Sequence, residues 1–122
     1  MSGLTVVIGV SENPSRYANM AVRSLQRHSE PVEAVGLKDG EIDGIKIHGN
    51  KPHFENVETI SLYVGPQHQP AWYDYIVSLK PKRIICNPGT ESDELAELCK
   101  KNGIEVVEAC TLVMLSIGNY QG

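Results

Sequence analysis

The chain has 122 residues, enough for one domain with a single hydrophobic core, and we expect that domain to span residues 1–122. A net charge of −4 without a basic stripe argues against a general nucleic-acid-binding protein. The apolar runs are too short to cross a bilayer, so we expect no membrane partner. With no signal-peptide pattern and three cysteines that lack close spacing, the sequence favours a cytoplasmic protein with reduced thiols.

Five apolar segments of strand length follow one another along the chain, at residues 4–8, 32–37, 59–64, 83–86 and 104–107. Each is nearly continuous in apolar residues, which is typical of strands covered on both faces of a parallel sheet. Between the second and third segments no helix is evident. Turn signals stand there at Asp39-Gly40 and Asp43-Gly44, and residues 45–47 fit a short edge strand.

Helical patterns fill most of the other gaps. Apolar residues recur at helical spacing in residues 18–25, 72–79 and 95–99. Thr90 and Asp93 fit the capping pair of the third of these helices, and Gly103 fits its end. Residues 111–117 are apolar nearly all round, which favours a buried helix or the contact of a homodimer.

This alternation predicts an α/β fold of the Rossmann-like, doubly wound class, with a mostly parallel five-stranded sheet and helices on both faces. In such sheets ligands bind beyond the carboxyl ends of the strands. The residues after each strand therefore mark the candidate site. They are residues 9–17, 36–38, 65–67, 87–89 and 108–110.

The first of these segments is the most informative. A buried strand, a glycine turn and a helix N-terminus together suit a phosphate, because the first backbone N–H groups of a helix lack intrahelical acceptors. Residues 9–14 lack the second and third glycines of the dinucleotide fingerprint, and Leu37 and Lys38 stand where NAD-binding proteins place an acidic residue. A lysine there suits a ligand with an extra ribose phosphate, such as NADP or coenzyme A (CoA). Arg16 is the candidate partner of a pyrophosphate.

The residues favour a binding protein over an enzyme. Ser11 is no nucleophile elbow, because Asn13 stands where that motif needs glycine. Cys110, near a predicted helix start at the cleft edge, is the candidate reactive thiol. His68 opens the helix after the third strand, close to the predicted cleft. The four histidines show no metal-ligand spacing, so we expect no metal site.

Four segments of the chain together carry a family resemblance: residues 9–17, residues 64–66, the turn at residues 86–92, and the last strand at residues 103–110, which runs into Cys110. They resemble the CoA-binding domain family, small bacterial Rossmann-like proteins related to the CoA-binding domain of succinyl-CoA synthetase. The chain departs from the usual family pattern in two places. Val35-Gly36-Leu37 stands where the family has valine-asparagine-proline, and Ala109 stands where it often has arginine.

The resemblance implies non-catalytic binding of CoA or acyl-CoA, a small nucleotide ligand. Its pyrophosphate would lie over Gly9, Val10, Ser11, Arg16, Tyr17 and Ala18. Its nucleoside would lie near Gly36, Leu37, Lys38, Val64 and Pro66, and its pantetheine arm would cross Asn87 and Gly89 toward Cys110. The alternatives are a nucleotide-binding subunit of an acyl-CoA ligase or transferase complex, and an NADP-binding module.

Overall fold

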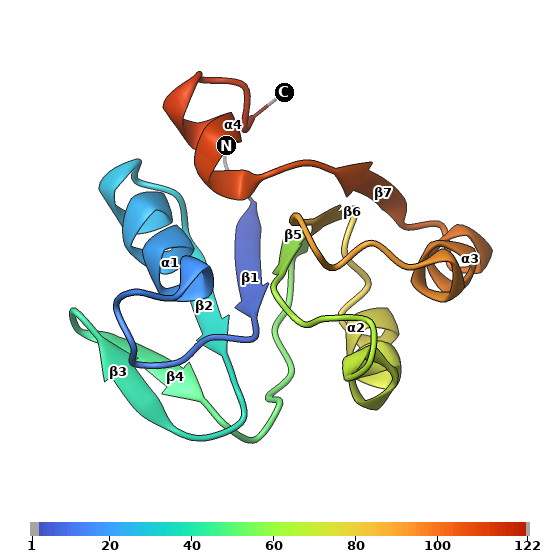
Figure 1. Ribbon diagram of the computed structural model, residues 1–122, viewed down its shortest axis with the longest axis horizontal. Helices are drawn as coiled ribbons and strands as arrows, with labels where there is room; N and C mark the ends of the chain where they lie inside the picture. The colour runs from blue at the N-terminus through green and yellow to red at the C-terminus, as the bar shows by residue number, and fades with distance from the viewer. Residues whose placement is uncertain (1–2, 122) are drawn as a thin grey trace.

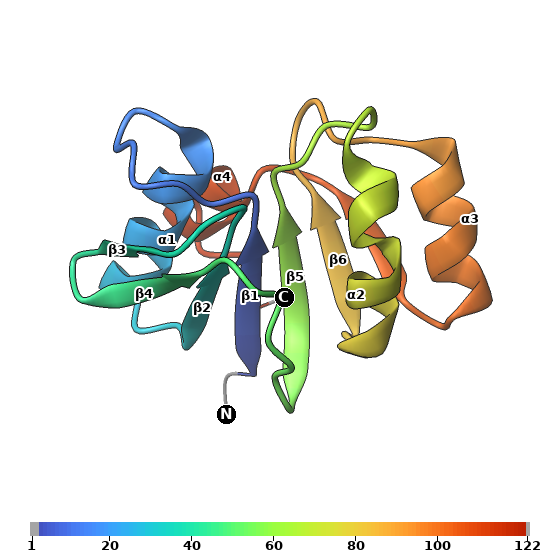
Figure 2. The ribbon, with the colours of Figure 1, turned by 90° about the horizontal axis from the view of Figure 1, so that it is seen from below.

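The computed structural model describes residues 3–121. A single β-sheet forms its centre. Its strands are β1 (Leu4–Ile8), β2 (Val32–Val35), β3 (Gly40–Ile42), β4 (Ile45–His48), β5 (Val57–Leu62), β6 (Arg83–Cys86) and β7 (Glu105–Glu108). They lie in the order β3-β4-β2-β1-β5-β6-β7. Only β3 and β4 are antiparallel within this part of the chain, so the loops that follow β1, β5 and β6 gather at one edge of the sheet (Figure 2).

Helices cover both faces of this sheet (Figure 1). They are α1 (Tyr17–Arg27), the 3₁₀ turn η1 (Gln69–Trp72), α2 (Tyr73–Ser78), α3 (Asp93–Lys101) and α4 (Thr111–Ser116). On one face α1 and α4 bury side chains such as Leu25 and Met114, and on the other α2 and α3 bury Ile76 and Leu95. The Rossmann-like, doubly wound α/β class is thereby confirmed. No helix within residues 3–121 has the length and apolar character needed to cross a membrane.

The expected number of five strands is wrong, because residues 40–48 form a β-hairpin and bring the described sheet to seven strands. Asp43 and Gly44 form its turn with φ angles of 46° and 86°, the left-handed geometry that two-residue hairpins favour. Residues 45–47 do form a strand, but β4 pairs with β2 and lies inside the sheet, while β3 forms the edge. The three residues of β3 bury only one apolar side chain, that of Ile42. A strand this short forms no alternating pattern that the sequence could reveal.

Two helices also differ from expectation, α3 in its cap and α4 in its burial. Helix α3 is capped by Ser92, whose Oγ accepts a hydrogen bond from the Leu95 N–H at 3.3 Å, and not by Thr90. Helix α4 buries only part of its surface, since Met114 is 9% exposed whereas Val113 and Ile117 are 53% and 66% exposed. A homodimer through this segment stays a prediction.

The turn after β1 is fixed by the neighbouring strand β2. The N–H groups of Gly9 and Val10 both donate to the Val35 carbonyl oxygen, at 2.9 and 3.0 Å. Gly9 has a φ of 99°, a left-handed conformation that glycine adopts without strain. The Val10 carbonyl then lies against Gly36, where an added Cβ would be only 2.1 Å from that oxygen. The chain can make this turn only because residue 36 has no side chain.

Gly36→Ala is therefore expected to lower the free energy of unfolding by about 1–3 kcal/mol, because the backbone at Val10 must move to admit a Cβ. Urea titration followed by the fluorescence of the single tryptophan, Trp72, measures the change. Gly65→Ala is the matched control, since nothing lies within 4 Å of a Cβ at that position, and its effect should stay within about 0.5 kcal/mol. If the two variants proved equally stable, the turn would not depend on Gly36.

Candidate functional site

A cleft of about 1080 Å³ opens where β1 and β5 lie side by side and end. The connection from β1 leads through α1 to β2 on one side of the sheet, and the connection from β5 leads through α2 to β6 on the other. Such a reversal of strand order leaves a crevice between the two loops, the usual place for a ligand in an open α/β sheet. The cleft is therefore the candidate functional site.

The structure brings most of the predicted site residues together around this cleft: Gly9, Val10, Ser11, Arg16, Tyr17, Ala18, Leu37, Lys38, Val64 and Gly89. Gly36, Pro66, Asn87 and Cys110 do not line it. His68 lines the cleft, as its place before η1 suggested. Sequence analysis did not single out Ile47, Tyr63, Pro70, Ala71 and Trp72 as site residues, although they also line it. Tyr63 follows β5 directly, and this position at a strand end is the signal that could have marked it.

The backbone amides of the glycine turn pair with β2. Gly9 and Val10 line the cleft, but their N–H groups donate to Val35 and are not free for a phosphate. The N–H groups of Ser11 and Glu12, and those of Tyr17 and Ala18 at the start of α1, have no hydrogen-bond acceptor within residues 3–121. The donors available to an anion are thus displaced from the glycine turn to the following loop and the helix start.

Helix α1 itself holds this loop in place. Asn19, only 2% exposed, donates from Nδ2 to the Ser11 carbonyl oxygen at 2.8 Å. Arg23 donates from Nε to Asn19 Oδ1 at 2.8 Å and from Nη2 to the Pro14 carbonyl oxygen at 2.9 Å. These bonds tie Ser11 and Pro14 of the loop to the first two turns of the helix. The side chains of α1 therefore hold the loop, and Arg16 is exposed at the cleft.

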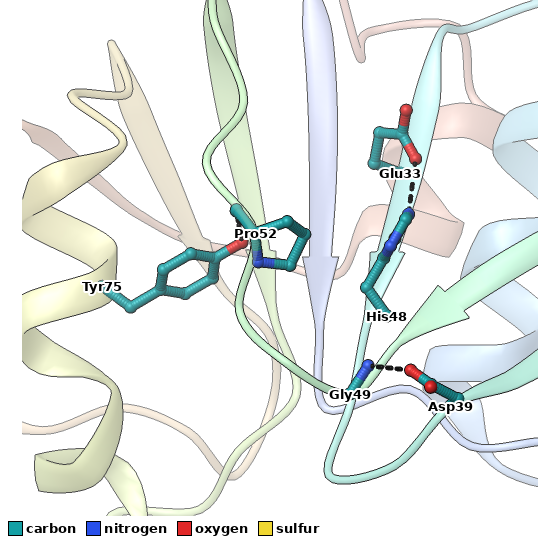
Figure 3. A network of polar contacts seen from close by, with 6 residues as sticks. All are labelled: Glu33, Asp39, His48, Gly49, Pro52 and Tyr75. Carbon is teal, nitrogen blue, oxygen red and sulfur yellow. Dashed lines mark hydrogen bonds and ion pairs between the residues drawn. The ribbon is translucent and has the colours of Figure 1, made fainter.

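The opposite wall of the cleft is the loop after β2, which carries Leu37 and Lys38. Asp39 Oδ1 accepts a hydrogen bond from the Gly49 N–H at 2.8 Å and joins this loop to the segment after β4 (Figure 3). Glu12 Oε2 likewise accepts from the Glu41 N–H at 3.0 Å. Both cleft carboxylates are thus engaged by backbone N–H groups.

The two basic side chains of the cleft, Arg16 and Lys38, form no ion pair within residues 3–121. Both belong to exposed residues, so their charges are free to meet an anionic ligand. The carboxylates of Glu12 and Asp39, by contrast, already accept hydrogen bonds. The two carboxylates keep their negative charge, but their oxygens are engaged by backbone N–H groups, whereas the cations of Arg16 and Lys38 have no partner among the described residues.

Asn87 and Cys110, which were expected along the pantetheine arm, do not line the cleft. Asn87 is 1% exposed, and its Nδ2 donates to the Leu62 carbonyl oxygen at 3.0 Å while its Oδ1 accepts from the Thr111 N–H at 2.8 Å. Cys110 is half-buried as the residue before α4 and does not line the cleft. Strand-end position alone could not reveal this for Asn87, because its side chain is engaged by the Leu62 carbonyl oxygen and the Thr111 N–H.

Tyr63 lines the cleft, and its hydroxyl is buried. Burial, together with the nearby Cys110 thiol, raises the pKa of Tyr63 to about 12, although the neighbouring hydroxyls of Ser61 and Thr111 lower it in part. Within the described part of the chain no hydrogen bond of good geometry reaches the Tyr63 hydroxyl. The side chain is therefore a neutral phenol over the ordinary pH range, and its hydroxyl adds little to stability.

Tyr63→Phe tests this description through pH. A folded-state pKa raised from 10.0 to about 12 adds stability that is complete below pH 10 and is lost as the pH rises toward 12. We expect the variant to be about as stable as wild type at neutral pH, and its free energy of unfolding to fall less between pH 10 and 12. Urea titrations at several pH values measure both effects. An identical decline in the two proteins would mean that Tyr63 titrates normally.

Residues 4–116 match the sequence model of a family described as CoA binding domain. The chain belongs to the CoA binding domain family. The resemblance seen in the sequence is thus confirmed over almost the whole chain. Gly36, where this chain departs from the usual family pattern, is the position against which the Val10 carbonyl lies, so no residue with a Cβ fits this backbone.

Solved structures agree with this assignment. The crystal structure of an uncharacterized protein shares 46% identity at a TM-score of 0.94, covering 98% of this chain and 99% of its own. A Thermus thermophilus protein shares 21% identity at a TM-score of 0.85, covering 98% of this chain and 91% of that one. The dinucleotide-forming acetyl-coenzyme A synthetase 1 of Ca. Korarchaeum cryptofilum, in complex with phosphate and ADP, shares 18% identity at a TM-score of 0.72, with coverage of 88% and 25%. The last two likenesses concern the fold alone. No curated protein sequence matches the chain.

Proposed function

We propose that this protein binds CoA or acyl-CoA in the cleft between β1 and β5 and does no chemistry on it. The observation that carries the proposal is the pair of unpaired cations, Arg16 and Lys38, beside free N–H groups at the start of α1, in a chain of the CoA binding domain family. A diphosphate fits between Arg16 and the N–H groups of Tyr17 and Ala18, because a helix N-terminus and a guanidinium both favour anions.

The nucleoside of this ligand is assigned to the β2 side of the cleft. Leu37 is 88% exposed there, and Ile47 of the neighbouring strand β4 also lines this side of the cleft. A solvent-exposed aliphatic side chain that packs against the face of a purine ring removes apolar surface from water, which favours binding. Lys38, next to Leu37, is then placed for the phosphate on the ribose. That extra phosphate distinguishes CoA from ADP and from NAD.

The pantetheine arm is assigned to the β6 side of the cleft. Parallel strands lie about 4.8 Å apart, so the tips of β2 and β6, separated by β1 and β5, span roughly 14 Å. The wall beyond β5 includes Pro70, Ala71, Trp72, Pro88 and Gly89, with Gln67, His68 and Thr90 as its polar members, a set without a carboxylate or ammonium group, which suits an uncharged arm. This route replaces the one over Asn87 and Cys110, whose side chains lie outside the cleft.

The same residues support binding without catalysis. Cys110 does not line the cleft, and the phenol of Tyr63 stays protonated because burial raises its pKa to about 12. His68 is exposed, and no neighbouring carboxylate pairs with it within residues 3–121. The cleft then lacks a paired nucleophile and base, as acyl transfer would require.

Lys38→Ala tests the contact with the ribose phosphate. The variant should bind CoA about tenfold more weakly than wild type, because one charge-assisted contact is lost. Its affinity for dephospho-CoA, which lacks that phosphate, should stay within about twofold of wild type. Isothermal titration calorimetry gives both affinities. Lys46→Ala, an exposed lysine of β4 outside the cleft, is the matched control and should change neither. Equal weakening of the two ligands would place the phosphate elsewhere, and tighter binding of NADPH than of CoA would favour the NADP alternative.

Arg16→Ala tests the diphosphate contact. Because CoA and dephospho-CoA share the diphosphate, both should bind about tenfold more weakly or worse, in contrast to the selective effect at Lys38. The thermal shift that each ligand produces is a convenient readout, since a ligand that binds only the folded state raises its stability. Arg27→Ala, in the last turn of α1, is the control. An unchanged thermal shift in Arg16→Ala would remove this residue from the site.

A further inference from the structure

Gln69, the first residue of η1, joins the two loops that bound the β6 side of the cleft. Its side chain is fully buried, at 0% exposure. The Nε2 group donates to the Val64 carbonyl oxygen at 2.9 Å and to the Thr90 carbonyl oxygen at 2.6 Å. Val64 and Thr90 both line the cleft, one from the loop after β5 and the other from the loop after β6. One side-chain amide thus sets the distance between these loops.

The backbone of the buried residue Asn87 holds Thr90 from the other side. The Thr90 N–H and Oγ1 both donate to the Asn87 carbonyl oxygen, at 3.0 and 2.8 Å. The Asn87 side chain in turn binds the Leu62 carbonyl oxygen of β5 and the Thr111 N–H of α4. Asn87 therefore anchors the loop after β6 to the sheet, and Gln69 links this loop to the loop after β5.

The chemistry of the contact requires a side chain with two donors. A primary amide donates both of its hydrogens to two carbonyl oxygens, whereas methionine donates none and an ionised glutamate would repel both. The remaining oxygen of Gln69, Oε1, is buried without a partner within the described residues. An unsatisfied buried oxygen costs stability. The two donor contacts of Nε2 must therefore account for a glutamine at this position.

We infer that Gln69 is a positioning residue that determines how well the cleft accepts the arm of its ligand as distinct from the nucleotide. The inference rests on the proposed function. Its contacts lie at the tips of β5 and β6, while Lys38 and Leu37 lie at the tip of β2, on the far side of β1. Loosening the Val64–Thr90 link therefore widens the arm side of the cleft and leaves the nucleoside side in place.

The test compares CoA with adenosine 3′,5′-bisphosphate, a nucleotide that has no arm. Gln69→Met matches the glutamine in length and removes both donors. We expect CoA to bind this variant about tenfold more weakly, while the bisphosphate binds within about twofold of wild type. Calorimetric titration measures both, with Gln26→Met, an exposed glutamine of α1 outside the cleft, as the control that should change neither.

Gln69→Glu provides a second variant and a readout that a purely structural role would not produce. A protonated glutamic acid keeps one donor for one carbonyl, and an ionised one keeps none. The affinity of this variant for CoA, relative to wild type at the same pH, should recover as the pH falls, while its affinity for the bisphosphate follows that of wild type. This variant at low pH also serves if Gln69→Met does not fold.

The outcomes separate the two claims. If wild type binds neither ligand, the proposed function fails, and the inference fails with it. If wild type binds CoA but both ligands weaken equally in Gln69→Met, or neither does, the inference alone is overturned. A selective loss of CoA, together with the pH-dependent recovery in Gln69→Glu, supports both.

Discussion

The Val35 carbonyl oxygen is the point on which the site depends. It accepts the N–H groups of both Gly9 and Val10, which bends the chain sharply as it leaves β1. This bend lays the Val10 carbonyl on Gly36 and sends the next residues over the sheet edge as the loop that leads to α1. Since Asn19 and Arg23 fasten that loop to the helix, the direction of α1 and the exposure of its first N–H groups follow from one shared acceptor.

The same arrangement leaves the N–H groups that are available to an anion outside the glycine turn. In a glycine-rich fingerprint the turn approaches the phosphates directly. Here the N–H groups of that turn donate to the Val35 carbonyl oxygen of β2, and the free donors belong to the following loop and to the start of α1. The opposite side of the cleft is ordered by side chains, because Gln69 and Asn87 link the ends of β5 and β6. The cleft is thus held by hydrogen bonds on both sides of β1.

Much of this architecture could be predicted from the sequence, because long apolar segments and helical periodicity are local signals. Strand β6 falls where its four residues predicted, and the cleft lies at the strand ends that the fold class implied. The turn at Asp43-Gly44 and the strand at residues 45–47 were predicted, but β3 was not, because a three-residue strand buries too little to form a pattern. The direction of the Gly9 amide could not be foreseen, since it depends on the register between β1 and β2. Asn87 and Gln69 likewise act through partners distant in sequence, which no local pattern reveals.

The account is tested most directly by a ¹H–¹⁵N NMR titration of the protein with CoA, combined with hydrogen exchange. The Ser11, Glu12, Tyr17 and Ala18 amide signals should shift on binding, whereas the Gly9 and Val10 amides should be protected from exchange with or without the ligand. Absence of shifts at the first four amides under saturating CoA, or fast exchange at Gly9 and Val10 in the free protein, would contradict it.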